Sequence, residues 1–92
     1  PARVWRASFD CVFRADHTAE LGSIAAPTLL MCGGRDDFAR DEQDTLAAAI
    51  PGASQLIYPD AGHALHWEEP QRFAADLAAF VARVVARDRS AA

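Results

Sequence analysis

Two short apolar runs, separated by a segment of helical pattern, constrain the fold of this sequence more than any other feature. The runs are TLLMC at residues 28–32 and SQLIY at residues 54–58, and both have the length of a strand. Continuous apolar runs of this length are typical of strands buried on both faces, as in parallel sheets. The segment RDEQDTLAAAI at residues 40–50 predicts a helix that stops at the following Pro-Gly pair. This order of strand, helix and strand predicts a parallel pair joined by a right-handed crossover.

Amphipathic segments flank this unit on both sides. Residues 3–15 predict a first helix, whose apolar face consists of Val4 or Trp5, Phe9, Val12 and Phe13. A last helix is predicted from Pro70, because proline suits the first turn of a helix. Its apolar stripe consists of Phe73, Leu77, Phe80, Val81, Val84 and Val85. The predicted order is therefore helix, strand, helix, strand, helix, which is an α/β fold.

Length and composition limit the classes of protein to which this chain can belong. Ninety-two residues, of which 51% are hydrophobic, indicate at most one domain with a packed core. A net charge of −4 without a basic cluster argues against nucleic acid or an anionic membrane as partner. No apolar run approaches the roughly 20 residues that span a bilayer, and no secretory signal is visible, so a cytoplasmic location is predicted. Cys11 and Cys32 are interpreted as small buried hydrophobic residues.

Chemically reactive residue types gather in the two loops that follow the predicted strands, GGRDDF and DAGHALHWEE. The carboxyl ends of adjacent parallel strands share one edge of a sheet, where ligands bind in open α/β folds. Asp37 or Asp36 can therefore face His63 there, and Gly62 is expected to let the backbone turn sharply. A carboxylate beside an imidazole fixes its tautomer, so that the other ring nitrogen can act as a general base.

Two longer stretches carry a resemblance to a known family. PTLLMCGGRDDF and GASQLIYPDAGHALHWEEPQRFAADLAAFV resemble the C-terminal part of the α/β-hydrolase superfamily, over about residues 20–85. The local sequence of these stretches is similar to that of the serine-dependent branch of the superfamily. This branch includes C–C bond hydrolases of ring-cleavage products, and haloperoxidase-like esterases are close to it. The resemblance implies that residues 1–92 are the C-terminal fragment of a single domain. They would form the last strand-helix-strand-helix portion of a doubly wound, mostly parallel sheet, preceded by a helix.

The resemblance also implies roles for individual residues. In the family, the triad acid lies three residues after a glycine that follows a late strand. Counting from Gly34 assigns the acid to Asp37, which is the preferred assignment, whereas counting from Gly33 would assign it to Asp36. The triad histidine follows a glycine in the next loop, and this residue is His63.

Other residues near these loops are weaker candidates. Phe38 and Trp67 are possible lining residues of a substrate pocket, although Trp67 is expected mainly to pack over the loop. His66 lies three residues after His63, and the sequence has neither an HExxH motif nor an evident third ligand. No metal and no cofactor are therefore expected.

The family's nucleophile has no counterpart in this sequence. It is a serine in G-x-S-x-G on a strand-to-helix elbow. The serines of this chain are Ser8, Ser23, Ser54 and Ser90, and none has that setting. The chain is therefore expected to supply an acid and a base but no nucleophile, and to be inactive alone.

The resemblance implies that the parent protein hydrolyses an ester or a related acyl or C–C bond of a small molecule through a Ser-Asp-His triad. The alternatives are a non-catalytic α/β module that self-associates and a relative that only binds a small molecule. Two parallel strands cannot cover both of their faces, so the isolated chain is expected to expose an edge and an apolar face and to self-associate.

Overall fold

The computed structural model describes residues 1–91. Its elements are α1 (Ala2–Arg14), η1 (Thr18–Ser23), β1 (Leu29–Gly33), α2 (Arg40–Ala49), β2 (Ser54–Tyr58), α3 (Leu65–Glu68) and α4 (Pro70–Ala91). The predicted order of helix, strand, helix, strand, helix is confirmed, and the structure adds two short helices, η1 and α3.

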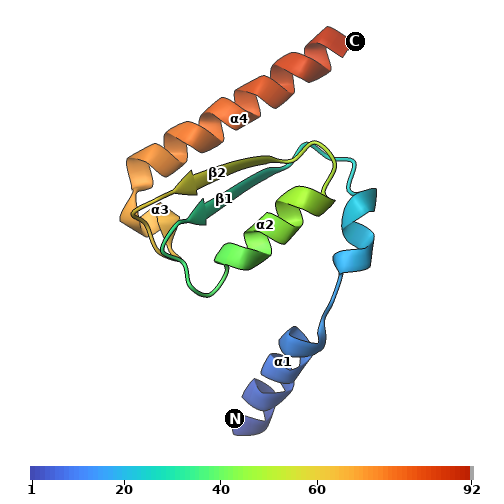
Figure 1. The fold of residues 1–92 in the computed structure, drawn as a ribbon, viewed down its shortest axis with the longest axis vertical. Coiled ribbons are helices and arrows are strands. Elements are labelled where there is room, and N and C mark those ends of the chain that lie inside the picture. The colour runs from blue at the N-terminus through green and yellow to red at the C-terminus, as the bar shows by residue number, and fades with distance from the viewer. Residues whose placement is uncertain (92) are drawn as a thin grey trace.

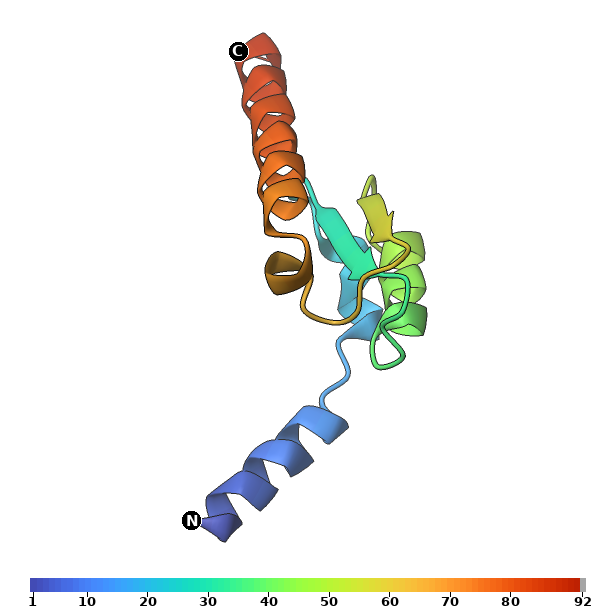
Figure 2. The same ribbon diagram turned by 90° about the vertical axis from the view of Figure 1, so that its left-hand side faces the viewer.

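The two strands form the parallel pair that the sequence predicts. Cys32 of β1 lies opposite Ile57 of β2, and Gly33 lies opposite Tyr58. Helix α2 lies on one face of this small sheet and α4 on the other, as Figures 1 and 2 show. Because the strands are parallel and in register, both carboxyl ends point to the same edge, and the two polar loops leave the sheet there.

The core is small and lies at that same edge. Tyr58, Ala61 and Leu65 form a buried cluster, and the half-buried Phe73 of α4 packs against it. Tyr58 is the largest fully buried side chain. The buried cluster therefore lies directly beneath the two loops.

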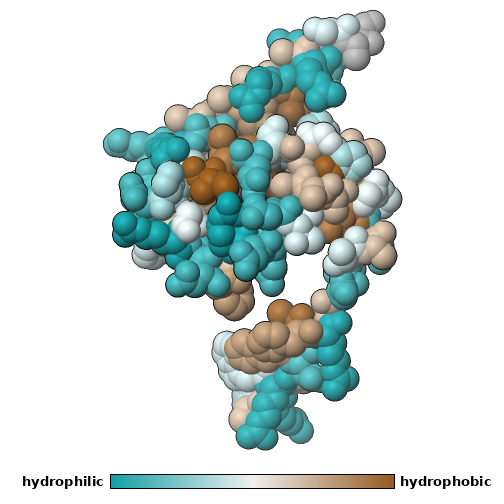
Figure 3. All heavy atoms as spheres, viewed as in Figure 1, coloured by the Kyte–Doolittle hydropathy of each residue, from teal (hydrophilic) through white to brown (hydrophobic). Residues whose placement is uncertain are grey.

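Helix α1 forms with the predicted amphipathic pattern, but it packs little against the sheet. It lies apart from the strands in both ribbon views (Figures 1 and 2) and contains no buried residue. Trp5, Phe9 and Phe13 stack on one side, with ring centroids 6.0 and 6.3 Å apart. A brown, apolar patch over α1 is visible in Figure 3. Cys11 on this helix is exposed, so its interpretation as a buried residue is wrong, whereas Cys32 is buried.

The apolar stripe of α4 is only partly covered. Phe73, Phe80 and Val84 are half-buried, whereas Leu77 and Val81 are 44% and 51% exposed. An exposed apolar face is thus present on α1 and on α4. Within residues 1–91, no helix combines the length and the apolar character needed to cross a membrane.

A polar network joins the end of β2 to α4. The hydroxyl of Tyr58 donates a hydrogen bond to Asp76, and the guanidinium of Arg72 lies 3.9 Å from the centre of the Tyr58 ring. Burial, followed by the bond to Asp76 and its charge, raises the pKa of Tyr58 to about 12. Since deprotonation would leave a charge in the core, Tyr58 acts as a neutral donor that fixes α4 on the sheet.

We expect Tyr58, the only tyrosine of the sequence, to titrate in the folded chain with a pKa of about 12. In urea, it should titrate near about 10. Because the folded-state pKa is raised, the contribution of neutral Tyr58 to stability is complete below the unfolded-state pKa and is lost as pH rises through the folded-state pKa. Absorbance of the phenolate, followed alongside circular dichroism, measures both effects.

Asp76→Asn should lower the pKa of Tyr58, because the Asp76 carboxylate accepts the hydroxyl hydrogen and opposes a second negative charge. Asp88→Asn, which changes an exposed acid on the same helix, is the matched control. Identical titrations of the folded and the urea-unfolded chain would contradict the burial of Tyr58.

Candidate functional site

Two glycines at the end of β1 allow the two loops to touch through their backbones. A Cβ atom on Gly33 would lie 2.1 Å from the carbonyl oxygen of Gly62 and 2.4 Å from that of Ala61. A Cβ atom on Gly34 would lie 2.7 Å from the carbonyl oxygen of Pro59. No side chain fits in these spaces without movement of the backbone, so the close approach requires glycine at both positions.

Hydrogen bonds hold the loops in this contact. The N–H of Gly34 donates to the carbonyl of Tyr58 at 2.7 Å, and the N–H of Arg35 donates to the carbonyl of Ala61 at 3.0 Å. The N–H of Asp36 donates to the carbonyl of Gly33 at 3.1 Å, and this hydrogen bond closes a tight turn. These bonds join the ends of two strands that are far apart in the chain and make one rigid unit of the two loops.

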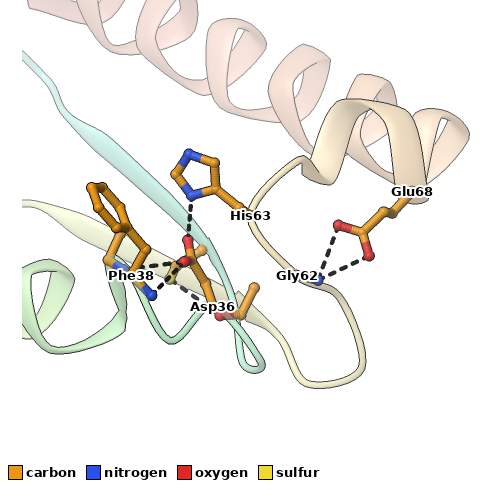
Figure 4. Close-up of polar contacts among 8 residues, drawn as sticks. Asp36, Phe38, Gly62, His63 and Glu68 are labelled. Atoms are coloured by element: carbon orange, nitrogen blue, oxygen red, sulfur yellow. Dashed lines mark hydrogen bonds and ion pairs between the residues drawn. The ribbon is translucent and has the colours of Figure 1, made fainter.

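Asp36 is the acid that this turn directs towards the histidine. Its side chain is 6% exposed, and its Oδ2 atom lies 2.8 Å from Nδ1 of His63 (Figure 4). Its Oδ1 atom accepts the N–H groups of Phe38 and Ala39, both at 3.1 Å. The bond to His63, and then the N–H groups of Ala39 and Phe38, lower the pKa of Asp36 against the opposing effect of burial, so it is a carboxylate at neutral pH.

The prediction that Asp37 lies against His63 is wrong. Asp37 is exposed, and its N–H donates to the carbonyl of Arg35 at 3.0 Å. The physical reason is that Gly33, the last residue of β1, starts the turn that brings the chain back over the sheet. The acid therefore lies three residues after Gly33, and the next residue points to solvent.

The expected sharp turn at Gly62 does not involve a left-handed backbone conformation. Among the described residues, Gly52 is the glycine with positive φ, at 69°. Gly62 has no positive φ, and a Cβ atom there would first meet the carboxylate of Glu68 at 3.3 Å.

His63 presents one ring nitrogen to the acid and the rest of the ring outward. Its side chain is 70% exposed. Because Asp36 is ionised, Nδ1 carries the proton of their hydrogen bond, and Nε2 is then the basic nitrogen. The ring of Phe38 meets the imidazole edge to face, with centroids 5.7 Å apart and an interplanar angle of 83°. A fixed tautomer with an accessible Nε2 is the arrangement that general base catalysis requires.

The two weak pocket candidates differ in position. Phe38 is 78% exposed and lies against His63, as described above. Trp67 is 81% exposed on α3, and its ring lies edge-on to His66, with centroids 6.3 Å apart. The structure therefore brings Phe38, but not Trp67, to the Asp36–His63 pair.

Sequence reasoning missed one residue that contacts the loop carrying His63. Both carboxylate oxygens of Glu68 lie 3.0 Å from the N–H of Gly62, the residue before His63 (Figure 4). The sequence analysis assigned no role to this acid. Within residues 1–91, no group of three or more His, Cys, Asp or Glu side chains could hold a metal ion.

The chain is similar to known hydrolases. Residues 1–76 match the sequence model of the Alpha/beta hydrolase family. A 2-hydroxy-6-oxononadienedioate/2-hydroxy-6-oxononatrienedioate hydrolase from Klebsiella pneumoniae is 39% identical over 69 residues, which cover 74% of this chain and 24% of that protein. The crystal structure of a hydrolase from Pseudomonas aeruginosa PA01 superposes with a TM-score of 0.68 at 32% identity, over 74% of this chain and 26% of that one.

A further match has a different name. A Mycobacterium tuberculosis protein with a provisional phosphoribosyl transferase name is 47% identical over 51 residues, which cover 54% of this chain and 11% of that protein. Because so little of that protein is matched, its name says little about the shared segment. The chain spans about a quarter of the length of the two hydrolases.

We expect Gly33→Ala to separate the two loops, because the new methyl group would meet two carbonyl oxygens. Overpacking of this kind costs about 1–3 kcal/mol of unfolding free energy. Urea denaturation measures the loss, and the NMR signals of the His63 ring should report the broken contact with Asp36.

Gly22→Ala is the matched control, because no atom lies within 4 Å of a Cβ atom at that position. Its unfolding free energy should stay within about 0.5 kcal/mol of the parent. Equal effects of the two substitutions would contradict the close contact at Gly33.

Proposed function

The chain belongs to the alpha/beta hydrolase family, and on that premise we propose that Asp36 and His63 are the acid and the base of a Ser-Asp-His triad. The observation that carries the proposal is the 2.8 Å contact between the buried Asp36 carboxylate and Nδ1 of His63. The two residues follow adjacent parallel strands, at the edge of the sheet where ligands bind in α/β folds.

The geometry supports a defined sequence of proton transfers. Asp36 accepts the Nδ1–H of His63 and holds the ring so that Nε2 is free to accept a proton. His63 takes the proton of a serine hydroxyl as that oxygen attacks the substrate, and Asp36 stabilises the imidazolium that forms. The imidazolium then gives the proton to the leaving group, and a water molecule repeats the cycle on the acyl intermediate.

We propose that the nucleophile is not one of the four serines of this sequence. Ser8 lies on α1, and Ser54 begins β2, at the opposite end of the strand from the His63 loop. The hydroxyls of Ser23 and Ser90 donate to carbonyls of their own helical segments. Because the chain spans about a quarter of its hydrolase relatives, a longer protein can supply the missing serine.

The substrate class follows from the relatives and the mechanism. The Klebsiella protein is named for the hydrolysis of 2-hydroxy-6-oxononadienedioate and 2-hydroxy-6-oxononatrienedioate. We propose that the parent of this chain hydrolyses a small-molecule ester or a C–C bond next to a carbonyl, since the same triad attacks a carbonyl carbon in both reactions.

A non-catalytic, self-associating module is the second candidate, and the exposed aromatic side of α1 favours it. The candidates differ in what they require of Asp36. A structural module needs no ionised acid beside an exposed imidazole, whereas the triad loses its tautomer control without one.

A chimeric enzyme tests the proposal. The segment of the Klebsiella hydrolase that this chain matches is replaced by the chain, and hydrolysis of that enzyme's own substrate is measured. Asp36→Asn should lower kcat by about 10⁴-fold, as for a triad acid, and His63→Ala should cost a similar factor. Asp37→Asn, at the exposed neighbour, is the matched control and should stay within about tenfold.

The isolated 92-residue chain should not turn over p-nitrophenyl acetate above buffer. Equal losses for Asp36→Asn and Asp37→Asn in a folded, active chimera would refute the assignment of the acid. An active chimera that tolerates both Asp36→Asn and His63→Ala would instead favour the non-catalytic module.

A further inference from the structure

Glu68 turns back from the end of α3 into the loop that carries His63. The N–H of Gly62 lies 3.0 Å from Oε1 and 3.0 Å from Oε2, so it points between the two oxygens (Figure 4). Among residues 1–91, the Glu68 carboxylate has no cationic partner within 4.0 Å. An exposed glutamate is ordinarily solvated, and here its charge is directed at one backbone donor.

This contact completes the support of the backbone directly before His63. The carbonyl of Ala61 accepts the N–H of Arg35 at 3.0 Å. The carbonyl of Gly62 lies against the Cα atom of Gly33, where a Cβ atom would come within 2.1 Å. Glu68 holds the remaining group, the N–H of Gly62, from the side opposite to β1 (Figure 4).

The imidazole depends on that backbone for its position. With a side chain that is 70% exposed, His63 has little surrounding packing to orient it. Its ring contacts are the bond to Asp36 and the edge of Phe38. A shift of the loop by a fraction of the hydrogen-bond length would therefore weaken the contact with Asp36 before it disturbed the core.

We propose that Glu68 is a positioning residue for His63, acting through the N–H of Gly62. The inference rests on the proposed function in that His63 is the base. Glu68 does not touch the reacting atoms. It restrains the loop so that Nδ1 stays within hydrogen-bond distance of Asp36, and the charge of the carboxylate makes this bond stronger than a neutral one.

The test reads the imidazole directly in the full 92-residue chain. With ¹⁵N-labelled histidine, the ring nitrogen shifts report the ratio of the Nδ1–H to the Nε2–H tautomer of His63. Asp36→Asn defines the signals of the lost contact. Glu68→Ala should shift the ring nitrogen signals of His63 towards those of Asp36→Asn. The ratio of the Nδ1–H to the Nε2–H tautomer should fall about tenfold, because a bond to a charged acceptor is removed. Glu68→Gln, which keeps a neutral acceptor, should lie between the two.

Glu69→Gln is the matched control, because the neighbouring acid contacts Arg72 instead of the loop. It should leave the His63 signals unchanged, and the signals of the remote His17 should be unchanged in every variant. Circular dichroism and the titration of Tyr58 show whether each variant is folded. If Glu68→Ala unfolds the chain, the His63 signals of the Glu68→Gln variant test the inference.

Unchanged His63 signals in a folded Glu68→Ala, or in Glu68→Gln if the Ala variant is unfolded, would overturn the inference. The same shift in Glu69→Gln would also overturn it. This result is distinct from a failure of the proposed function. If the chimera keeps its activity with Asp36→Asn while Glu68→Ala still shifts the ring nitrogen signals of His63, the proposed triad is wrong. The inference that Glu68 positions His63 then still stands.

Discussion

The close packing of two glycines against a neighbouring loop is the contact on which the rest of the site depends. Gly33 and Gly34 bring the end of β1 so near to the Pro59–Gly62 backbone that a single added carbon would collide with it. Only at this separation can the N–H of Arg35 reach the carbonyl of Ala61. The loops then behave as one unit, because a movement of either would break hydrogen bonds to the other.

Buried residues in this molecule are concentrated beneath the proposed site. The buried cluster of Tyr58, Ala61 and Leu65 lies beneath the loops, whereas α1 has no buried residue and α4 leaves much of its apolar stripe exposed. A core this small cannot rely on apolar burial alone to orient a side chain. Backbone contacts and short polar networks therefore carry much of the positioning at the site.

The proposed acid and base are placed in different surroundings, and each suits its proposed role. Asp36 is buried and accepts two backbone N–H groups besides the imidazole, so its charge is compensated and its orientation fixed. His63 is largely exposed, so Nε2 is accessible to a reacting group. In the proposed triad, a buried acid with an exposed base gives a fixed anchor for the group that would meet substrate.

The sequence by itself determined the order of elements, the parallel pairing and the position of His63 after a strand end. Apolar periodicity and strand length are local properties, so they can be read from neighbouring residues. The tertiary structure alone decided which of Asp36 and Asp37 contacts His63, and it revealed the contact of Glu68 with Gly62. Adjacent aspartates in a turn have the same composition around them and the same propensities. What separates them is the direction of the backbone after Gly33, and that direction is set by a loop almost thirty residues further along the chain.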